Sequence, residues 1–408
     1  MLELRGPVVA ALEVTPEGAE WPGHGYFKAE KRPPLTPSQW GAVIDKLGPF
    51  VNEFRVTGGE PMARADIFEI LDSLERAKRP YHIFTNGRWE NRPETMLGFK
   101  KLTYVQSFLL YLHGPDAESH GALGPAPFDE AVKAIEQTAA TGLEVNTSTV
   151  ITKQNAERLE ELVEMAMKKG SRHSVFSRYI GPPRPDIEPS SDLLRAALDT
   201  LDGLRQSGYN VALGSCVPAC YHKSFNQGCS AAITYCAIDP WGGMRPCDHS
   251  PTVVGNVLEK GVTDVWRSKA MRQWRTRLPD ACKPCSKITF CPGGCRSQAE
   301  HLGVPADPLI VAPLPLEEPA LLEVTLEEDL CPVPRYAIRE EDFGWSLIRQ
   351  TYVIPVTHKA GNVLYAFDGK TTLGEIEKKF GPAALSFVYS LYERNFVELR
   401  PGQMAEVG

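Results

Sequence analysis

Residues 52–85, NEFRVTGGEPMARADIFEILDSLERAKRPYHIFT, hold the pattern that decides the fold. Residues 52–58 and 81–85 are short segments that contain aromatic and β-branched residues, and they predict strands. Residues 64–78, between these strands, place apolar side chains three and four positions apart, which predicts a helix. A strand, a helix and a second strand in this order predict a parallel pair joined by a right-handed crossover.

The same alternation extends over the first 214 residues. Further strands are expected at 8–14, 104–112, 143–151, 172–180 and 209–213, and helices at 36–47, 127–142, 156–170 and 191–208. Six or so such units predict an α/β fold with a parallel sheet, either a full or partial barrel or a doubly wound sheet. In both arrangements, ligands bind at the carboxyl ends of the strands.

Composition narrows the class of protein. The chain has 408 residues, enough for two or three domains, and its net charge of -7 argues against a broad nucleic-acid surface. No run approaches 18 apolar residues, and the first residues have no small-residue cleavage site, so neither a membrane span nor a signal peptide is predicted. The expected location is the cytoplasm.

The ten cysteines are all in the second half of the chain. They are Cys216, Cys220, Cys229, Cys236, Cys247, Cys282, Cys285, Cys291, Cys295 and Cys331. Clustering on Gly- and Pro-rich segments of a cytosolic chain favours metal binding over disulfides. Four thiolates suit either structural zinc or a [4Fe–4S] cluster. Cys236 lies in an apolar predicted strand and is interpreted as a core residue.

The cysteine pattern resembles the SPASM domain of radical SAM peptide-maturing enzymes. The similarity covers Cys229-x12-Gly242-x4-Cys247, Cys282-x2-Cys285-x5-Cys291-x3-Cys295 and the flanking DPWGGMRPC, CPGGCRS and DPL. The resemblance implies one or two auxiliary [4Fe–4S] clusters. It assigns Cys220, Cys229, Cys247 and Cys295 to the first cluster and Cys282, Cys285 and Cys291 to the second. The position of the second cluster's last ligand reads Ile310, so that cluster either lacks a fourth thiolate or uses Cys331 or Cys216.

The first half resembles the radical SAM domain of the same family. TGGEP at 57–61 is similar to the motif in which backbone groups at Gly58 and Gly59, with the Glu60 carboxylate, receive the amino group of S-adenosylmethionine. FTNG at 84–87 adds Asn86, and the polar strand within 144–155 adds Ser148, both as cofactor-binding residues implied by the resemblance. YLHG begins with Tyr111, where the family has a small residue.

One feature of the family is missing. Its first loop carries Cys-x3-Cys-x2-Cys, but counting from Val14-Thr15 to Tyr26 places Gly18, Pro22 and Gly25 at the three positions. Glu17, Glu20 and His24 are nearby, but hard ligands suit an iron–sulfur cluster poorly. We therefore expect no radical SAM cluster, and binding of S-adenosylmethionine becomes a doubtful possibility.

Four segments are expected along the chain. These are a degenerate radical SAM-like partial (β/α)6 TIM-like barrel (1–214), a SPASM iron–sulfur domain (215–310) with one helix at 261–277, a linker (311–331) and a winged-helix-like domain (332–408). The last segment reads mainly as a strand, three short helices and a strand. It resembles the peptide-recognition (RRE) domains that add a peptide to a sheet edge, here at 351–356. A docking or dimerisation domain is the alternative.

These observations lead to three functional hypotheses. The first is a pseudoenzyme or accessory factor that binds a peptide or protein and carries auxiliary clusters, presenting a substrate to a catalytically complete partner or relaying electrons. The second is a non-radical or atypical enzyme that uses the retained S-adenosylmethionine-type pocket or the clusters to modify a peptide. The third is a radical enzyme with unusual cluster ligands. No nucleic-acid or membrane partner is expected.

Overall fold

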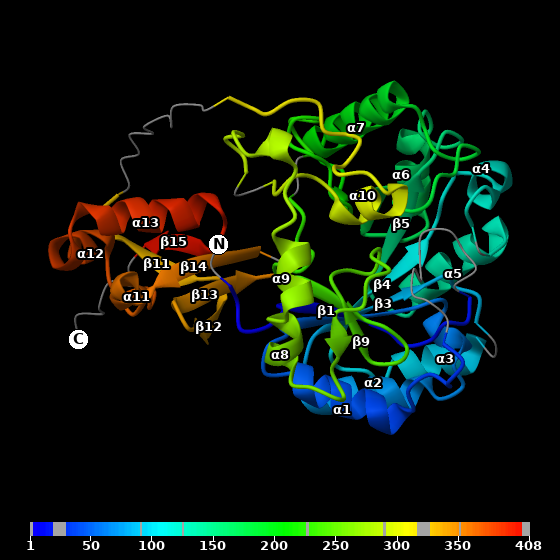
Figure 1. The fold of residues 1–408 in the computed structure, drawn as a ribbon, viewed down its shortest axis with the longest axis horizontal. Coiled ribbons are helices and arrows are strands. Elements are labelled where there is room, and N and C mark those ends of the chain that lie inside the picture. Colours follow the sequence, from blue (N-terminus) through cyan, green and yellow to red (C-terminus); the bar gives the residue numbers. More distant parts are fainter. Residues whose placement is uncertain are drawn as a thin grey trace. The chain divides into compact units, whose positions relative to one another are not determined.

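The computed structural model describes residues 3–18, 30–89, 92–124, 126–225, 228–288, 291–315, 327–350 and 352–401. The chain forms two compact units. The larger comprises residues 9–317, and the smaller combines residues 1–8 with residues 318–408. Figure 1 shows the elements of both, coloured along the sequence.

A ten-stranded sheet is the framework of the larger unit. Its central strands are β1 (Val9–Glu13), β2 (Glu53–Thr57), β3 (Tyr81–Thr85), β4 (Val105–Tyr111), β5 (Val145–Ile151), β6 (His173–Arg178) and β7 (Val211–Leu213). These seven strands lie side by side in chain order, and all their pairings are parallel. Consecutive order is the arrangement of a barrel rather than of a doubly wound sheet, in which the strand order reverses. The predicted α/β class with a partial barrel is confirmed.

Amphipathic helices connect these strands. They are α1 (Pro37–Leu47), α2 (Ile67–Ala77), α3 (Arg92–Phe99), α4 (Ala117–Gly121), α5 (Phe128–Ala140), α6 (Leu159–Lys168) and α7 (Ser191–Gln206), with the 3₁₀ turn η1 at Pro61–Ala63. In α2 the apolar side chains Ile70, Leu71 and Leu74 are fully buried, as their spacing predicts. Thr36 begins α1 with a capping box shared with Gln39.

The cysteine-rich segment extends the same sheet beyond β1. β8 (Tyr235–Ile238) pairs in parallel with β1, and β9 (Gly243–Arg245) and β10 (Gly255–Asn256) follow as antiparallel strands. The helices of this segment are η2 (Asp280–Cys282) and α10 (Arg296–Leu302), preceded by a pair at 262–275. The cysteine-rich segment therefore continues the barrel's sheet.

The single helix expected at 261–277 is wrong. The structure has two, α8 (Val262–Trp266) and α9 (Lys269–Arg275). The hydroxyl of Ser268 accepts a hydrogen bond from the N–H of Met271 and caps α9. A serine at this position favours the start of a new helix over continuation of the preceding one, because its side chain bonds to the backbone. Apolar spacing alone does not show this break.

The smaller unit is richer in strands than the sequence indicated. Beyond the expected strand β14 (Tyr352–Thr357), helices α11 (His358–Leu364), α12 (Leu373–Phe380) and α13 (Pro382–Glu393), and final strand β15 (Val397–Pro401), it contains β11 (Leu330–Pro334), β12 (Ala337–Glu341) and β13 (Gly344–Arg349). Strands β12, β13 and β14 form an antiparallel sheet, and β11 pairs with β15. β11 begins inside the segment expected to be a linker.

Residues near the start of the chain belong to this smaller unit. The N–H of Arg5 donates to a carboxylate oxygen of Glu341 at 2.7 Å. The Arg339 guanidinium donates at 3.0 Å to the carbonyl oxygens of Gly6 and of Pro7. Glu341 itself is buried and also pairs with Arg339. The initial segment thus lies in the smaller unit, and the next residue, Val9, begins β1 of the larger one.

Candidate functional site

The Glu60 carboxylate is at the carboxyl ends of β2 and β3. It accepts hydrogen bonds from the Thr85 hydroxyl at 2.7 Å, the Asn86 N–H at 2.7 Å and the Met62 N–H at 3.0 Å. Burial raises the pKa of Glu60 to about 7, although all three bonds act in the opposite direction. The structure therefore holds together Glu60 and Asn86, two residues to which the resemblance assigns cofactor binding.

Gly58 allows the first loop to contact this strand end. A side-chain Cβ at Gly58 would lie 2.6 Å from the carbonyl oxygen of Thr15, and the φ of +132° strains any other residue. The N–H of Gly59 donates to the same carbonyl at 2.9 Å, and the N–H of Glu60 donates to the Glu17 carbonyl at 2.7 Å. Residues 15–17 thus lie directly against TGGEP.

Of the three positions where the family pattern has cysteines, the structure describes only Gly18. Its φ is +77°, and a Cβ built on it would lie 3.2 Å from both the Cβ and the backbone nitrogen of Glu60. Contacts this close are tighter than ordinary side-chain packing allows. In this arrangement glycine fits the loop, whereas a cysteine would strain the backbone and displace Glu60 by a few tenths of an ångström. Pro22 and Gly25 lie outside the described residues, as do Glu20 and His24.

Ser148 is opposite Tyr111 in the pairing of β5 with β4. Tyr111 is buried, its ring stacks near that of His113 with centroids 6.1 Å apart, and burial raises its pKa well above the usual range. Because the Glu60 carboxylate contributes to this rise, the two side chains lie in the same interior region. The bulky ring thus occupies space where the family pattern has a small residue.

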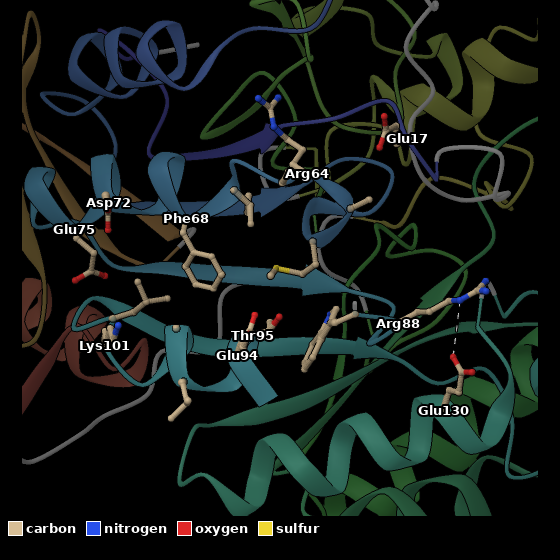
Figure 2. A pocket seen from close by; sticks show the side chains of 18 of the residues that line it. Glu17, Arg64, Phe68, Asp72, Glu75, Arg88, Glu94, Thr95, Lys101 and Glu130 are labelled. Atoms are coloured by element: carbon tan, nitrogen blue, oxygen red, sulfur yellow. Dashed lines mark ion pairs between the residues drawn. The ribbon is translucent and has the colours of Figure 1, made fainter. Parts of the chain in front are cut away.

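A groove opens on the outer side of this strand end. Figure 2 shows its lining, which includes Glu17, Arg64, Phe68 and Arg88, with an ion pair of 4.0 Å between Arg88 and Glu130. Both charge signs and several apolar side chains contribute to it. This groove could not be predicted from the sequence, because its lining comes from α2 and α3, which are separate in the chain, and from loops near Glu17 and Arg88.

Cys216, Cys229, Cys247 and Cys295 form the first group of thiols. The thiol of Cys216 donates a hydrogen bond to the sulfur of Cys229, which lowers the pKa of Cys229 to about 6 and raises that of Cys216. Cys295 acts electrostatically on both Cys216 and Cys247. Burial raises the pKa of Cys295 to about 11 and that of Cys247 well above its usual range.

Cys220, Cys282, Cys285 and Cys291 form the second group. All four line one small cavity, together with Ile310. Burial, then the neighbouring thiols of Cys220, Cys291 and Cys285, raise the pKa of Cys282. Backbone N–H groups donate to three of these sulfurs at 3.4 Å, from Ala219 to Cys291, from Val311 to Cys220 and from Leu314 to Cys285.

This grouping corrects the one that the resemblance implied. The structure places Cys216, not Cys220, beside Cys229, and it places Cys220 with the second group. Cys331 is in neither group: it is buried in β11 of the smaller unit, where its thiol donates to the Lys370 carbonyl at 3.3 Å. The expectation that Cys331 or Cys216 completes the second group is therefore not supported by the geometry.

A buried ion pair adjoins the first group. Arg178, at the end of β6, pairs with Asp307 in two hydrogen bonds, one of 3.0 Å, and both side chains are almost fully buried. Asp307 also accepts the N–H of Cys295 at 2.7 Å, and the thiols of Cys295 and Cys216 act on Arg178. Sequence reasoning missed both residues, although DPL, which contains Asp307, was one of its matches.

The thiol groups fit iron–sulfur clusters by their donor chemistry. Several buried thiols in mutual repulsion resist ionisation in the protein alone, and bound iron compensates that charge. N–H groups directed at sulfur are the outer contacts that tune such clusters. Among the described residues, no three His, Cys, Asp or Glu side chains already converge as a site for a single ion. The fit thus rests on the donor sets and their surroundings.

Family models and curated relatives agree with this architecture. Residues 23–166 match the radical SAM superfamily, and residues 229–287 match the iron–sulfur cluster-binding domain SPASM. Mycofactocin maturase MftC of Mycobacterium tuberculosis is 29% identical over 309 residues, covering 70% of this chain and 77% of the relative. PqqA peptide cyclase of Granulibacter bethesdensis is 25% identical over 281 residues, covering 65% and 75%.

A solved structure has a similar fold over three quarters of the chain. Streptococcus suis SuiB bound to S-adenosylmethionine superposes with a TM-score of 0.62 at 21% identity, covering 75% of this chain and 78% of SuiB. At this identity the likeness supports the fold alone. In a separate observation, no helix among the described residues is long and apolar enough to cross a membrane.

Proposed function

From the premise that this chain carries a radical SAM domain and a SPASM iron–sulfur domain, we propose that it is an accessory protein of peptide modification without radical SAM chemistry. It would bind a peptide or protein and hold one or two auxiliary [4Fe–4S] clusters. Such clusters transfer single electrons, with potentials set by their surroundings. The protein would present the substrate to a catalytically complete partner or relay electrons to it.

The observation that carries the proposal is the first loop. The sequence has no cysteine before Cys216, so no thiolate can reach the radical SAM position from this half of the chain. Gly18 adopts a φ of +77° against Glu60, an arrangement that favours glycine there. The absence of cysteines from this half of the chain and the glycine-favouring backbone at position 18 both support the proposal.

Peptide recognition is proposed for the smaller unit. The names of one relative and one solved complex support a peptide substrate: PqqA peptide cyclase, and SuiB bound to its precursor peptide SuiA. β14 has one pairing partner in the described sheet, β13, so its other edge can accept a strand. Tyr352 at its start is half exposed.

Anaerobic reconstitution followed by iron analysis and EPR tests the proposal. Two clusters give about eight irons per chain, and S-adenosylmethionine should leave the EPR signals unchanged. About twelve irons, together with formation of 5′-deoxyadenosine under reducing conditions, would overturn it. Partner capture by a protein lacking residues 332–408 tests the peptide-binding role separately, since unchanged capture would reject that role for the smaller unit.

The second candidate is an enzyme that still uses the S-adenosylmethionine-type pocket. The observation that favours it is the position of Glu60, buried beside Asn86 with a pKa of about 7, where a proton could be exchanged. Titration calorimetry with S-adenosylmethionine separates the two candidates. Binding weakened by Glu60→Gln but not by Glu118→Gln, an exposed carboxylate of α4, would favour it. Absence of heat at millimolar ligand would remove it.

A further inference from the structure

We propose that Cys220 is the fourth iron ligand of the second cluster, in place of the downstream position that Ile310 occupies. The inference rests on the clusters of the proposed function and specifies how the second one is held. It implies that every iron of that cluster has a cysteine ligand. A cluster of this kind serves electron transfer rather than direct binding of a substrate at an open iron.

Cys220 and Ile310 share one cavity. Its lining comprises Cys220, Cys282, Cys285, Cys291 and Ile310, with backbone and side chains of the flanking Gly, Ala and Pro residues. A cavity lined by three cysteines of one motif and a fourth from a distant segment has a complete donor set for a [4Fe–4S] cluster. The upstream thiol thus enters the space that the family pattern assigns to a downstream one.

Hydrogen bonds place the Cys220 sulfur beside the position that lacks a thiol. The N–H of Val311, the residue after Ile310, donates to the Cys220 sulfur at 3.4 Å. Three residues later, the N–H of Leu314 donates to the Cys285 sulfur at 3.4 Å, and the Leu314 carbonyl accepts from Ser286 at 3.1 Å. This segment therefore supplies N–H donors to the group of sulfurs, while Cys220 supplies the additional thiol.

A turn sets Cys220 apart from Cys216, the competing candidate. The N–H of Tyr221 donates to the Pro218 carbonyl at 2.9 Å and closes a turn over residues 218–221, which contains Cys220. Before this turn, Cys216 bonds to Cys229 in the first group. Within the turn, the N–H of Ala219 donates to the Cys291 sulfur at 3.4 Å, which fixes the turn to the second group. Four residues of separation are thus enough to divide the two thiols between the groups.

The test compares serine variants of the full chain after anaerobic reconstitution. Cys220→Ser should lose about one of about eight irons on mild oxidation and give a [3Fe–4S] EPR signal of about one spin per chain. Cys331→Ser, outside both groups, is the matched control and should behave as the unsubstituted protein. Cys216→Ser should also give a [3Fe–4S] signal, but from the first cluster.

A rescue variant distinguishes the two clusters and guards against misfolding. Adding Ile310→Cys to Cys220→Ser restores a thiol in the same cavity and should abolish the [3Fe–4S] signal. Adding it to Cys216→Ser should not. Spectra of Cys220→Ser identical to those of Cys331→Ser, or rescue of Cys216→Ser by Ile310→Cys, would overturn the assignment. An unsubstituted protein that binds no iron would overturn the proposed function, and the assignment with it.

Discussion

Gly18 stands at the first of the three positions where the family pattern has cysteines. In the described loop its backbone is left-handed and its missing side chain leaves room for Glu60. A cysteine at this position would need a strained backbone and a shift of the neighbouring strand end. A cysteine introduced at position 18 would therefore meet resistance from packing, and Pro22 and Gly25 would add no side-chain ligand beside it.

Gly18→Cys is expected to be more destabilising than Gly142→Cys. Both glycines have positive φ, but a Cβ at Gly142 meets nothing within 4 Å, whereas one at Gly18 presses on Glu60. The difference should be about 1–3 kcal/mol, the usual cost of overpacking. Thermal unfolding of the two variants measures it, and equal transition temperatures would contradict the described loop conformation.

Glu60 predicts a pH dependence of stability. Its pKa is about 7 in the folded protein, above the ordinary value of 4.5 for a glutamate, so the folded state binds more protons than the unfolded state between these values. Stability contributed by protonated Glu60 is therefore present below about pH 4.5 and declines until about pH 7, by at most about 1.4 kcal/mol per pH unit. Glu60→Gln should flatten the calorimetric transition temperature over this range, leaving the decline due to Glu13, whose pKa is also about 7. An unchanged profile, matching that of Glu118→Gln, would argue against burial of the Glu60 charge.

At the scale of elements, the ion pair between Arg178 and Asp307 connects β6 to the loop that follows α10. The Asp307 carboxylate accepts a hydrogen bond from the N–H of Cys295, the N-cap residue of α10, and Arg178 lies at the end of β6. Removing one partner leaves the other as an unpaired buried charge, which costs about 3–5 kcal/mol, whereas removing both costs less than the sum. The barrel and the cysteine-rich segment are thus coupled through charge as well as through the pairing of β1 with β8.

Arg178→Met and Asp307→Asn should each destabilise the larger unit, and the double variant should be less unstable than additivity requires. Asp307→Asn should also reduce retention of the first cluster, because the support of the Cys295 backbone is weakened. Denaturant unfolding and iron content measure the two effects. Additive losses in the cycle would show that the residues do not act as a pair.

The sequence predicted the parallel framework well and the cysteine partition poorly. The periodicity of strands and helices is a local property of the sequence, so the strand predicted at 81–85 has the same bounds as β3. Which thiols meet depends on a turn at Pro218 and on where distant loops return, and the family resemblance assigned Cys220 to the first group, whereas it lies with the second. β12 and β13 were missed because their burial alternates weakly, with Ile338 half exposed and Glu341 buried.

At the scale of the whole molecule, the chain divides into two compact units with separate cores. Nine of the ten cysteines belong to the larger unit, and Cys331 belongs to the smaller one. Metal binding stabilises a fold only where its ligands are. Iron should therefore affect the two units differently.

Removal of iron by a chelator is expected to lower the unfolding temperature of the larger unit and leave that of the smaller unchanged. Calorimetry of the reconstituted and chelator-treated protein should resolve two transitions, of which one moves. Thr372→Ala, which removes the capping box of α12, marks the transition of the smaller unit by lowering it by about 4–8 °C. A chelator effect on the transition so marked would contradict the assignment of the clusters to the larger unit.

The bond between the Arg5 N–H and Glu341, 336 positions apart, has a consequence for synthesis on the ribosome. At about 5–20 residues per second, roughly 17–67 s pass between the emergence of the two partners. During that interval the whole larger unit can fold, while residues 3–8 wait without their sheet. These early-made residues are thus among the last to find their place, and any factor that protects nascent chains would meet them exposed.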